Sequence, residues 1–431
     1  MPIRLDHRSP DFAKRFAAFL SMKREVSRDI DAAARAIVED VAARGDTALI
    51  EATAKYDRLT LTAETLRVSA EEIAAATAAC DPKTVDALKL ARDRIEIYHR
   101  RQLPKDERFT DALGVELGWR WSAVDAAGVY FPRGPAAHPS SVLMNAVPAK
   151  VAGVARVVMV VPSPDGKLNP LVLAAASLAG ITEVYRVGGA QAVAALAYGT
   201  ATIKPVAKIV GPGNAYVAAA KRIVFGKVGI DMIAGPSEVL VMADRTGNAD
   251  WIAADLLAQA EHDVNAQSIL LTDDEELAAN VERAVEAQLT TLPRAAIARP
   301  SWNDFGAIIL VQSMEEALPL ADAIAAEHLE IMTADSEALA SRVRNAGAIF
   351  IGPHTPEAIG DYVGGSNHVL PTARSARFSS ALSVLDFMKR TSILKCGPDQ
   401  LRALGPAAMT LGVAEGLDAH ARSVGLRLNL R

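Results

Sequence analysis

The sequence predicts an α/β protein with two doubly wound, Rossmann-like parallel-sheet domains and small helical elements at the N- and C-terminus. Two series of short β-branched runs alternate with alanine-rich runs, the first beginning near residue 128 and the second ending near residue 351. Such alternation is typical of parallel strands with helices on both faces. With 431 residues, half of them hydrophobic, the chain has enough apolar material for more than one core.

The first quarter of the chain is mostly helical in composition. Residues 30–44 and 71–101 are rich in Ala, Glu, Lys and Arg and have few glycines or prolines, which favours helices. The first alternating series then predicts strands at 154–162, 183–187 and 207–210, and helices at 169–178, 190–197 and 214–224.

The second alternating series begins just after Gly235-Pro236-Ser237. Residues 390–431 follow it, return to helix-like composition and predict a small separate element. The series itself predicts strands at 238–243, 267–272, 307–311, 329–332 and 348–351, and helices at 251–261, 275–289 and 314–327.

Composition and charge exclude several classes of protein. The net charge is −5 and no long basic run occurs, so nucleic acid is not an expected partner. The most apolar stretch, 151–161, is interrupted by Arg156 and falls short of the ~20 apolar residues of a membrane helix. The charged N-terminus does not resemble a signal peptide, and two distant cysteines, Cys80 and Cys396, suit a reducing compartment. We therefore expect a cytoplasmic protein without membrane partners.

Two glycine turns each follow a predicted strand and open a predicted helix. They are Gly188-Gly189-Ala190-Gln191 and Gly211-Pro212-Gly213-Asn214. Glycine lets backbone amides approach a phosphate, and a helix N-terminus favours an anion. Neither turn completes the G-x-G-x-x-G pattern, so an ordinary tight turn is the alternative. Since ligands of open parallel sheets bind beyond the carboxyl ends of the strands, we expect the functional residues there.

Nitrogen and oxygen donors suggest a metal site. Gln259 and His262 are three residues apart and would share a helix face. Asp361 and His420 could complete four ligands, and a set without thiolate suits zinc, manganese or cobalt. The alternative is a surface or capping role for the Gln-x-x-His pair.

Glu327 and His328 are adjacent at the end of a predicted helix. A histidine with a pKa near neutrality is a natural general base, and a neighbouring carboxylate can orient a water. In the alternative interpretation, His328 packs under the sheet and Glu327 is solvated. The segment from Asp361 to His368 carries two glycines between polar groups, which is typical of a functional loop.

Taken together, the motifs of the chain resemble the histidinol dehydrogenase family. The matching segments run in order across nearly the whole chain, so the resemblance is highly specific. They are residues 139–145, 187–191, 208–214, 231–240, 260–263, 326–330, 364–372, 386–392 and 415–420.

The family resemblance implies an NAD-dependent enzyme with one zinc ion per subunit. It implies oxidation of L-histidinol through L-histidinal to L-histidine, the last steps of histidine biosynthesis, by a homodimer whose intertwined subunits share active sites. It also implies an N-terminal helical arm (1–25), a split first α/β domain (26–127 and 237–385), an inserted NAD-binding domain (128–236) and a C-terminal helical dimerisation element (386–431).

The resemblance further assigns individual roles. His328 would take the alcohol proton and Glu327 would activate water to attack the aldehyde. His420 would come from the partner subunit. The implied zinc ligands are Gln259, His262, Asp361 and His420; the implied NAD contacts are Tyr130, Gln191 and Asn214; the implied substrate contacts are Ser237, His328, His368 and Glu415 together with the zinc ligands.

One segment departs from the family pattern. The chain has Pro132-Arg133-Gly134-Pro135 and His138 where the family usually has Pro-Gly-Gly and a tyrosine. We hypothesise that Arg133 contacts the NAD pyrophosphate, since guanidinium suits phosphate.

Three other functions compete with this interpretation. In a paralogue acting on another small polar alcohol, Glu415 and His420 would lack their imidazole-bearing substrate. A silent metal- or nucleotide-binding protein would have no use for Glu327 and His328. A zinc hydrolase would not need the two glycine turns.

Overall fold

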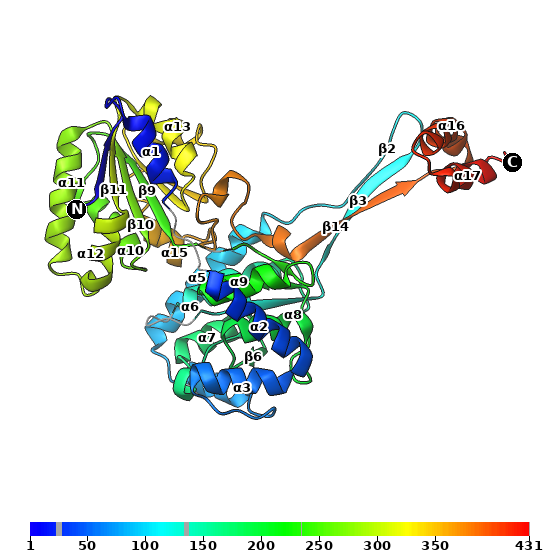
Figure 1. Cartoon of the computed structure of the whole chain (residues 1–431), viewed down its shortest axis with the longest axis horizontal. Helices are drawn as coiled ribbons and strands as arrows, with labels where there is room; N and C mark the ends of the chain where they lie inside the picture. Colours follow the sequence, from blue (N-terminus) through cyan, green and yellow to red (C-terminus); the bar gives the residue numbers. More distant parts are fainter. Residues whose placement is uncertain (23–27, 133–137, 234, 431) are drawn as a thin grey trace. The chain divides into compact units, whose positions relative to one another are not determined.

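The computed structural model describes residues 1–22, 28–132, 138–233 and 235–430 (Figure 1). The chain forms two compact units, one of Met1–Gln102 with Asp125–Phe387 and one of Leu103–Val124 with Met388–Arg431. The first unit contains two parallel sheets, each with helices packed on it. The predicted fold class is therefore confirmed.

The first sheet has six parallel strands. Its strands from β9 onward run in the spatial order third, second, first, fourth, fifth, which is a doubly wound order. The strand β1 from the chain start is added at one edge (Figure 1). In spatial order the strands are β1 (Ile3–Asp6), β11 (Ala307–Leu310), β10 (Gln267–Thr272), β9 (Glu238–Ala243), β12 (His328–Met332) and β13 (Ala348–Ile351).

Alternating residues of β9 separate two apolar cores. Val239 and Val241 pack with the fully buried Trp302 on one face, and Leu240 and Met242 pack on the other. This two-residue period is what a central strand requires. The first core is covered by α10 (Ala249–Ala260), α11 (Glu275–Leu289) and α12 (Ala295–Phe305), and the second by α1 (Phe12–Leu20), α13 (Met314–Ile324) and α14 (Ser336–Ala340). The short helix α15 (Glu357–Tyr362) follows β13.

The second sheet repeats the same third-second-first-fourth-fifth order with five parallel strands. In spatial order these are β6 (Glu183–Tyr185), β5 (Arg156–Val160), β4 (Ala126–Tyr130), β7 (Lys208–Val210) and β8 (Gly229–Ile230). Its helices are α2 (Arg28–Arg44), α3 (Asp46–Asp57), α4 (Ala70–Ala78), α5 (Pro82–Arg100), α6 (Pro139–Val151), α7 (Pro170–Leu178), α8 (Gly189–Tyr198) and α9 (Ala215–Val224).

The packing of the early helices differs from the domain limits predicted above. We assigned 26–127 to the same domain as 237–385, whereas Ala34, Val38 and Leu49 of α2 and α3 share a core with α8 and α9 of the second sheet. Likewise, the range 1–25 is not only a helical arm, because it adds β1 to the first sheet. An amphipathic pattern shows which helix face is buried but not which sheet buries it. The sequence pattern therefore could not predict that α2 and α3 pack on the second sheet.

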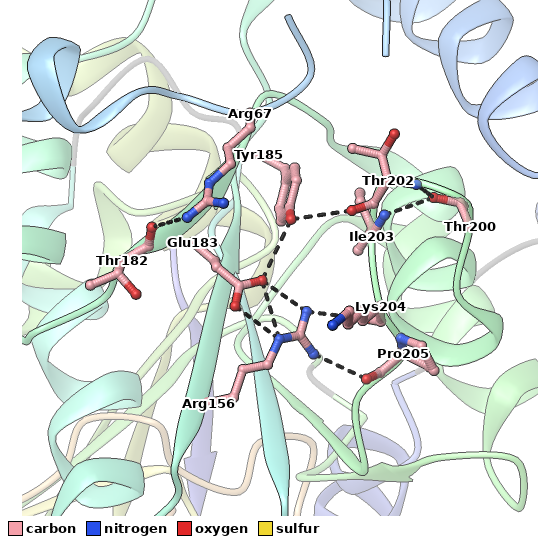
Figure 2. A network of polar contacts seen from close by, with 10 residues as sticks. All are labelled: Arg67, Arg156, Thr182, Glu183, Tyr185, Thr200, Thr202, Ile203, Lys204 and Pro205. Atoms are coloured by element: carbon pink, nitrogen blue, oxygen red, sulfur yellow. Dashed lines mark hydrogen bonds and ion pairs between the residues drawn. The ribbon is translucent and has the colours of Figure 1, made fainter. Parts of the chain in front are cut away.

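A polar network closes the amino end of the second sheet. Figure 2 shows Arg156, the first residue of β5, paired with Glu183, the first residue of β6, with an Nη2–Oε2 distance of 2.9 Å. The Arg156 guanidinium also donates to the carbonyls of Lys204 and Pro205 at 3.1 Å, and Tyr185 donates to Glu183. These bonds tie the loop before β7 to the strands, which is a structural task.

The second unit is a small antiparallel sheet with two helices. The strands lie in the order β14 (Met388–Lys395), β3 (Glu116–Ala123) and β2 (Glu107–Thr110), followed by α16 (Pro398–Ala414) and α17 (Asp418–Arg427). Helices α16 and α17 pack closely at small residues such as Gly405 and Gly412.

The predicted helical element 386–431 is thus wrong in its first part, which is a strand. The error arose because most residues of β14 are exposed, so they lack the apolar alternation of a half-buried strand. Within the described residues, no helix combines the length and apolarity that crossing a bilayer requires.

Candidate active site

A cavity of about 240 Å³ lies in the first unit. Its lining includes Gly211 and Pro212 after β7 of the second sheet, and Ser237, Glu327 and His328 before or at the start of strands of the first sheet. The second sheet therefore contributes its carboxyl end, as predicted, and the first sheet contributes its amino end.

The expected place of the functional residues was therefore wrong for the first sheet. His328 begins β12, Ser237 precedes β9, and Gln259 with His262 lies at the C-terminal end of α10. Because each helix runs opposite to the strands it connects, the end of α10 lies at the amino ends of the strands. A helix C-terminus carries partial negative charge and favours cations, which suits a metal-binding role for this end.

Glu327 and His328 are both buried, and the backbone of Glu238 forms hydrogen bonds with both side chains. The His328 Nδ1–H donates to the carbonyl of Glu238 at 3.1 Å, and the N–H of Glu238 donates to Glu327 Oε2 at 3.0 Å. The buried His328 Nε2 atom has no hydrogen-bond partner among the described residues and lies 3.7 Å from Asp361 Oδ1. The alternative of a solvated Glu327 is excluded, since this residue is only 6% exposed and accepts from the N–H of Glu238.

Carboxyl groups surround His328. Glu327 and Glu357 each place an oxygen 3.8 Å from His328 Nδ1. Burial raises the pKa of Glu327 to about 7 and that of Glu357 to about 8. Burial alone would lower the pKa of His328, but the charges of Glu357, Glu327 and Asp361 outweigh it, so the pKa lies well above the ordinary value. The cluster therefore shares protons near neutral pH, which is a property of acid–base sites.

Gln259, in the last turn of α10, has a buried side chain whose hydrogen bonds are unmet. Its side chain is fully buried, and neither its amide oxygen nor its nitrogen has a hydrogen-bond partner among the described residues. Unpaired buried amides are rare because each costs about 1–3 kcal/mol. His262, one helical step further, lines the cavity together with Asp361. These three residues fit the oxygen and nitrogen ligands of a zinc ion.

A second set of donors overlaps this one. His328, Glu357 and Asp361 place one ligand atom each within 4.8 Å of one another. Glu357 was missed by the sequence reasoning, although its spacing of four residues from Asp361 would have placed both carboxylates on one face of α15.

His368 has both ring nitrogens engaged. Its Nδ1–H donates to the carbonyl of Asp361 at 2.9 Å, and the Ser141 hydroxyl donates to Nε2 at 3.1 Å. The neighbouring Asn367 donates to the carbonyl of Met144 at 2.7 Å. These bonds fix the loop after α15 against α6, so His368 faces the cavity in a defined orientation.

The predicted cofactor residues gather at the carboxyl end of the second sheet. The Tyr130 hydroxyl accepts from the N–H of Gly189 at 2.9 Å, and Gln191 is buried in the first turn of α8. Asn214 caps α9 by accepting from the N–H groups of Tyr216 and Val217 at 3.1 Å. Arg133 lies outside the described residues, and His138 lines the cavity.

Comparison with known proteins identifies the family. The family model described as histidinol dehydrogenase matches residues 20–428. The chain belongs to the histidinol dehydrogenase family. It is 81% identical over 430 residues to the histidinol dehydrogenase of Bradyrhizobium diazoefficiens and 78% identical over 431 residues to that of Rhodopseudomonas palustris, with 100% of both chains covered in each case. The crystal structure of histidinol dehydrogenase from Elizabethkingia anophelis matches with a TM-score of 0.94 at 36% identity, covering 99% of this chain and 98% of that one.

Family membership confirms the resemblance seen in the sequence, and the geometry sorts the predicted histidinol dehydrogenase residues into two groups. In the first unit, the predicted residues that line the cavity are Ser237, His262, Glu327, His328, Asp361 and His368, while Tyr130, Gln191 and Asn214 lie at the carboxyl end of the second sheet and Gln259 near the end of α10. Glu415 is the C-cap residue of α16 and His420 lies in α17 of the second unit, where both are exposed. Their part in the site stays a prediction.

Proposed function

We propose that the chain is an NAD-dependent, zinc-containing histidinol dehydrogenase that oxidises L-histidinol through L-histidinal to L-histidine. The observation that carries the proposal is the buried Glu327–His328 pair in the cavity of a chain that belongs to this family. The reaction removes four electrons in two steps, and membership of the family implies that it ends histidine biosynthesis. The sparse free cysteines, Cys80 and Cys396, support a cytoplasmic location.

The protein's own residues supply the proton chemistry. In its neutral form, His328 takes the alcohol proton at Nε2, which has no hydrogen-bond partner among the described residues, while its Nδ1–H stays fixed on the Glu238 carbonyl. Glu327, whose pKa near 7 lets it exchange a proton at neutral pH, orients and deprotonates the water that attacks the aldehyde. The cavity places the aldehyde beside these two buried side chains between the two steps.

Two groups would complete the site. Gln259, His262 and Asp361 would hold the zinc together with His420 of the partner subunit, and Tyr130, Gln191 and Asn214 would contact NAD. When bound, zinc would fix the amino and imidazole nitrogens of histidinol and offset the carboxylates around His328, and NAD would accept a hydride in each oxidation. Ser237, His368 and Glu415 would complete the contacts to the substrate.

The second unit supports a homodimer. Apart from Val115, its buried residues are small, such as Gly405 and Ala421. About half of its large apolar side chains are exposed, among them Leu394, Leu411, Val413 and Leu426. A unit with so small a core needs a covering surface, and a second copy of the chain is the occupant that the family implies. Light scattering should give twice the chain mass of 45.5 kDa; a stable monomer at micromolar concentration would contradict the dimer.

The decisive test of the function is the stoichiometry of NADH formation. Purified protein with limiting L-histidinol and excess NAD should form two NADH per histidinol, lose activity on chelation and regain it with zinc. The Gln259→Ala variant should need more zinc for the same activity, by roughly tenfold to hundredfold. One NADH per substrate, or no NADH at all, would overturn the four-electron assignment.

A further inference from the structure

A buried ion pair holds the glycine turn after β7. Lys221 of α9 pairs with Asp231, which follows β8, and their side chains are only 3% and 1% exposed. Lys221 Nζ donates to the carbonyl of Gly211 at 3.0 Å, and the N–H of Gly211 donates to Asp231 Oδ2 at 2.8 Å. Both backbone groups of one glycine are thus bound by the two members of one ion pair.

Gly211 is a position where the backbone needs such support. Its φ of 109° lies in the region that favours glycine, and a Cβ there would lie 2.3 Å from the carbonyl oxygen of Tyr130. The turn therefore packs directly against the end of β4. It leads through Gly213 to Asn214, whose side chain begins α9, so the position of Gly211 sets where Asn214 and the helix N-terminus lie.

The ion pair is not needed to fill space. Replacing a buried ion pair by apolar side chains of similar volume is often neutral or stabilising, so burial of two charges here calls for a positional role. All four residues, Gly211, Pro212, Lys221 and Asp231, line the cavity of the active site. The pair is therefore at the place where a ligand would contact the turn.

We propose that Lys221 and Asp231 are positioning residues for NAD, which hold the Gly211 turn and thereby orient Asn214 and the N-terminus of α9 toward the cofactor. This inference rests on the proposed function, because it takes the turn as part of the NAD site. The residues act through the turn and take no part in the proton transfers of Glu327 and His328.

The test compares three variants with a control. Lys221→Met should raise the KM for NAD about tenfold and leave kcat within about twofold, since only binding of the cofactor is weakened. Lys221→Arg, which keeps the charge, should recover much of the affinity. The double variant Lys221→Met with Asp231→Asn leaves no unpaired buried charge, so it should fold well and still show the raised KM. Glu183→Gln, which breaks the ion pair at the opposite end of the same sheet (Figure 2), should lower the Tm without changing the KM.

Isothermal titration with NAD separates this inference from the proposed function. If the double variant binds NAD as tightly as the wild type, or if Glu183→Gln weakens NAD as much as Lys221→Met does, the positioning role is overturned. Weakened NAD binding in the double variant supports it even in protein that does not oxidise histidinol, whereas inactive wild-type protein that binds NAD would overturn only the proposed function.

Discussion

The two parallel sheets have the same strand order, but the polar side chains near their amino ends differ in whether their hydrogen bonds are satisfied. At the second sheet, the side chains of Arg156, Glu183 and Tyr185 have no buried nitrogen or oxygen without a partner (Figure 2). At the first sheet, Gln259 and His328 have buried atoms that lack hydrogen-bond partners among the described residues. Since each such atom costs about 1–3 kcal/mol of stability, an unsatisfied strand end indicates a ligand, and a satisfied one indicates a structural clamp.

The His328→Asn variant has the largest expected effect and is the strongest test of this difference between the two sheets. We expect kcat to fall by about 10²–10⁴-fold, the usual contribution of a general base, while the Tm changes little because the asparagine amide can keep the hydrogen bond to the Glu238 carbonyl. Steady-state kinetics and a thermal melt measure the two effects. The same substitution at the exposed His354 is the control and should change neither; a large fall in the Tm of His328→Asn would make this strand end structural instead.

The converse prediction concerns Glu183→Gln at the second sheet. The side chains of Arg156 and Glu183 are 21% and 23% exposed, between an exposed and a fully buried ion pair, so we expect a loss of about 1–3 kcal/mol in the free energy of unfolding. At 25 °C, kcat should be unchanged.

A matched control for this variant is Glu286→Gln, which breaks the more exposed Arg299–Glu286 pair and should lose at most about 0.5 kcal/mol. Urea unfolding measures both variants. Equal losses would show that the network of Figure 2 stabilises no more than a surface pair.

Most helices and strands could be predicted from the sequence, because their formation depends on residues that are close together in the chain. The predicted strand 238–243 and the predicted strand 267–272 coincide with β9 and β10, since buried β-branched runs of that length suit central strands. The strand β14 was missed because its residues are mostly exposed. Which sheet α2 covers depends on contacts distant in sequence, and periodicity holds no information on them.

The site was predicted residue by residue only where a family motif existed. The motifs located Glu327, His328 and Asp361, and the structure brings these together. Glu357 and the Lys221–Asp231 pair emerged only from distances, because neither Glu357 nor Lys221 lies in one of the family motifs. The site was predicted at the carboxyl end of the first sheet, whereas its residues lie at the amino end. The carboxyl-end rule suits glycine turns that approach a phosphate and does not cover metal-ligand side chains at a helix C-terminus.

The smallest expected effect sharpens the comparison within the first sheet. Glu330 of β12 is buried, and one of its carboxylate oxygens has no hydrogen-bond partner among the described residues. Burial, with the charge of Asp255, raises its pKa to about 9. The folded protein therefore binds a proton that the unfolded chain, with a carboxyl pKa of about 4.3, releases. The stability that this bound proton gives to the folded protein is fully present below about pH 4 and is lost as the pH rises toward 9.

The Glu330→Gln variant removes that dependence, because an amide stays neutral at every pH. The Tm of the variant minus that of the wild type should grow from pH 5 to pH 9, reaching about 2 °C or more, since 1 kcal/mol corresponds to about 2–4 °C in a domain of this kind. Melts should be run with a chelator present, so that metal binding does not contribute. A Tm difference that is constant or shrinks with rising pH would mean that Glu330 is already ionised in the folded protein at pH 5. The unsatisfied oxygen of Glu330 would then be part of a charged carboxylate over the whole pH range.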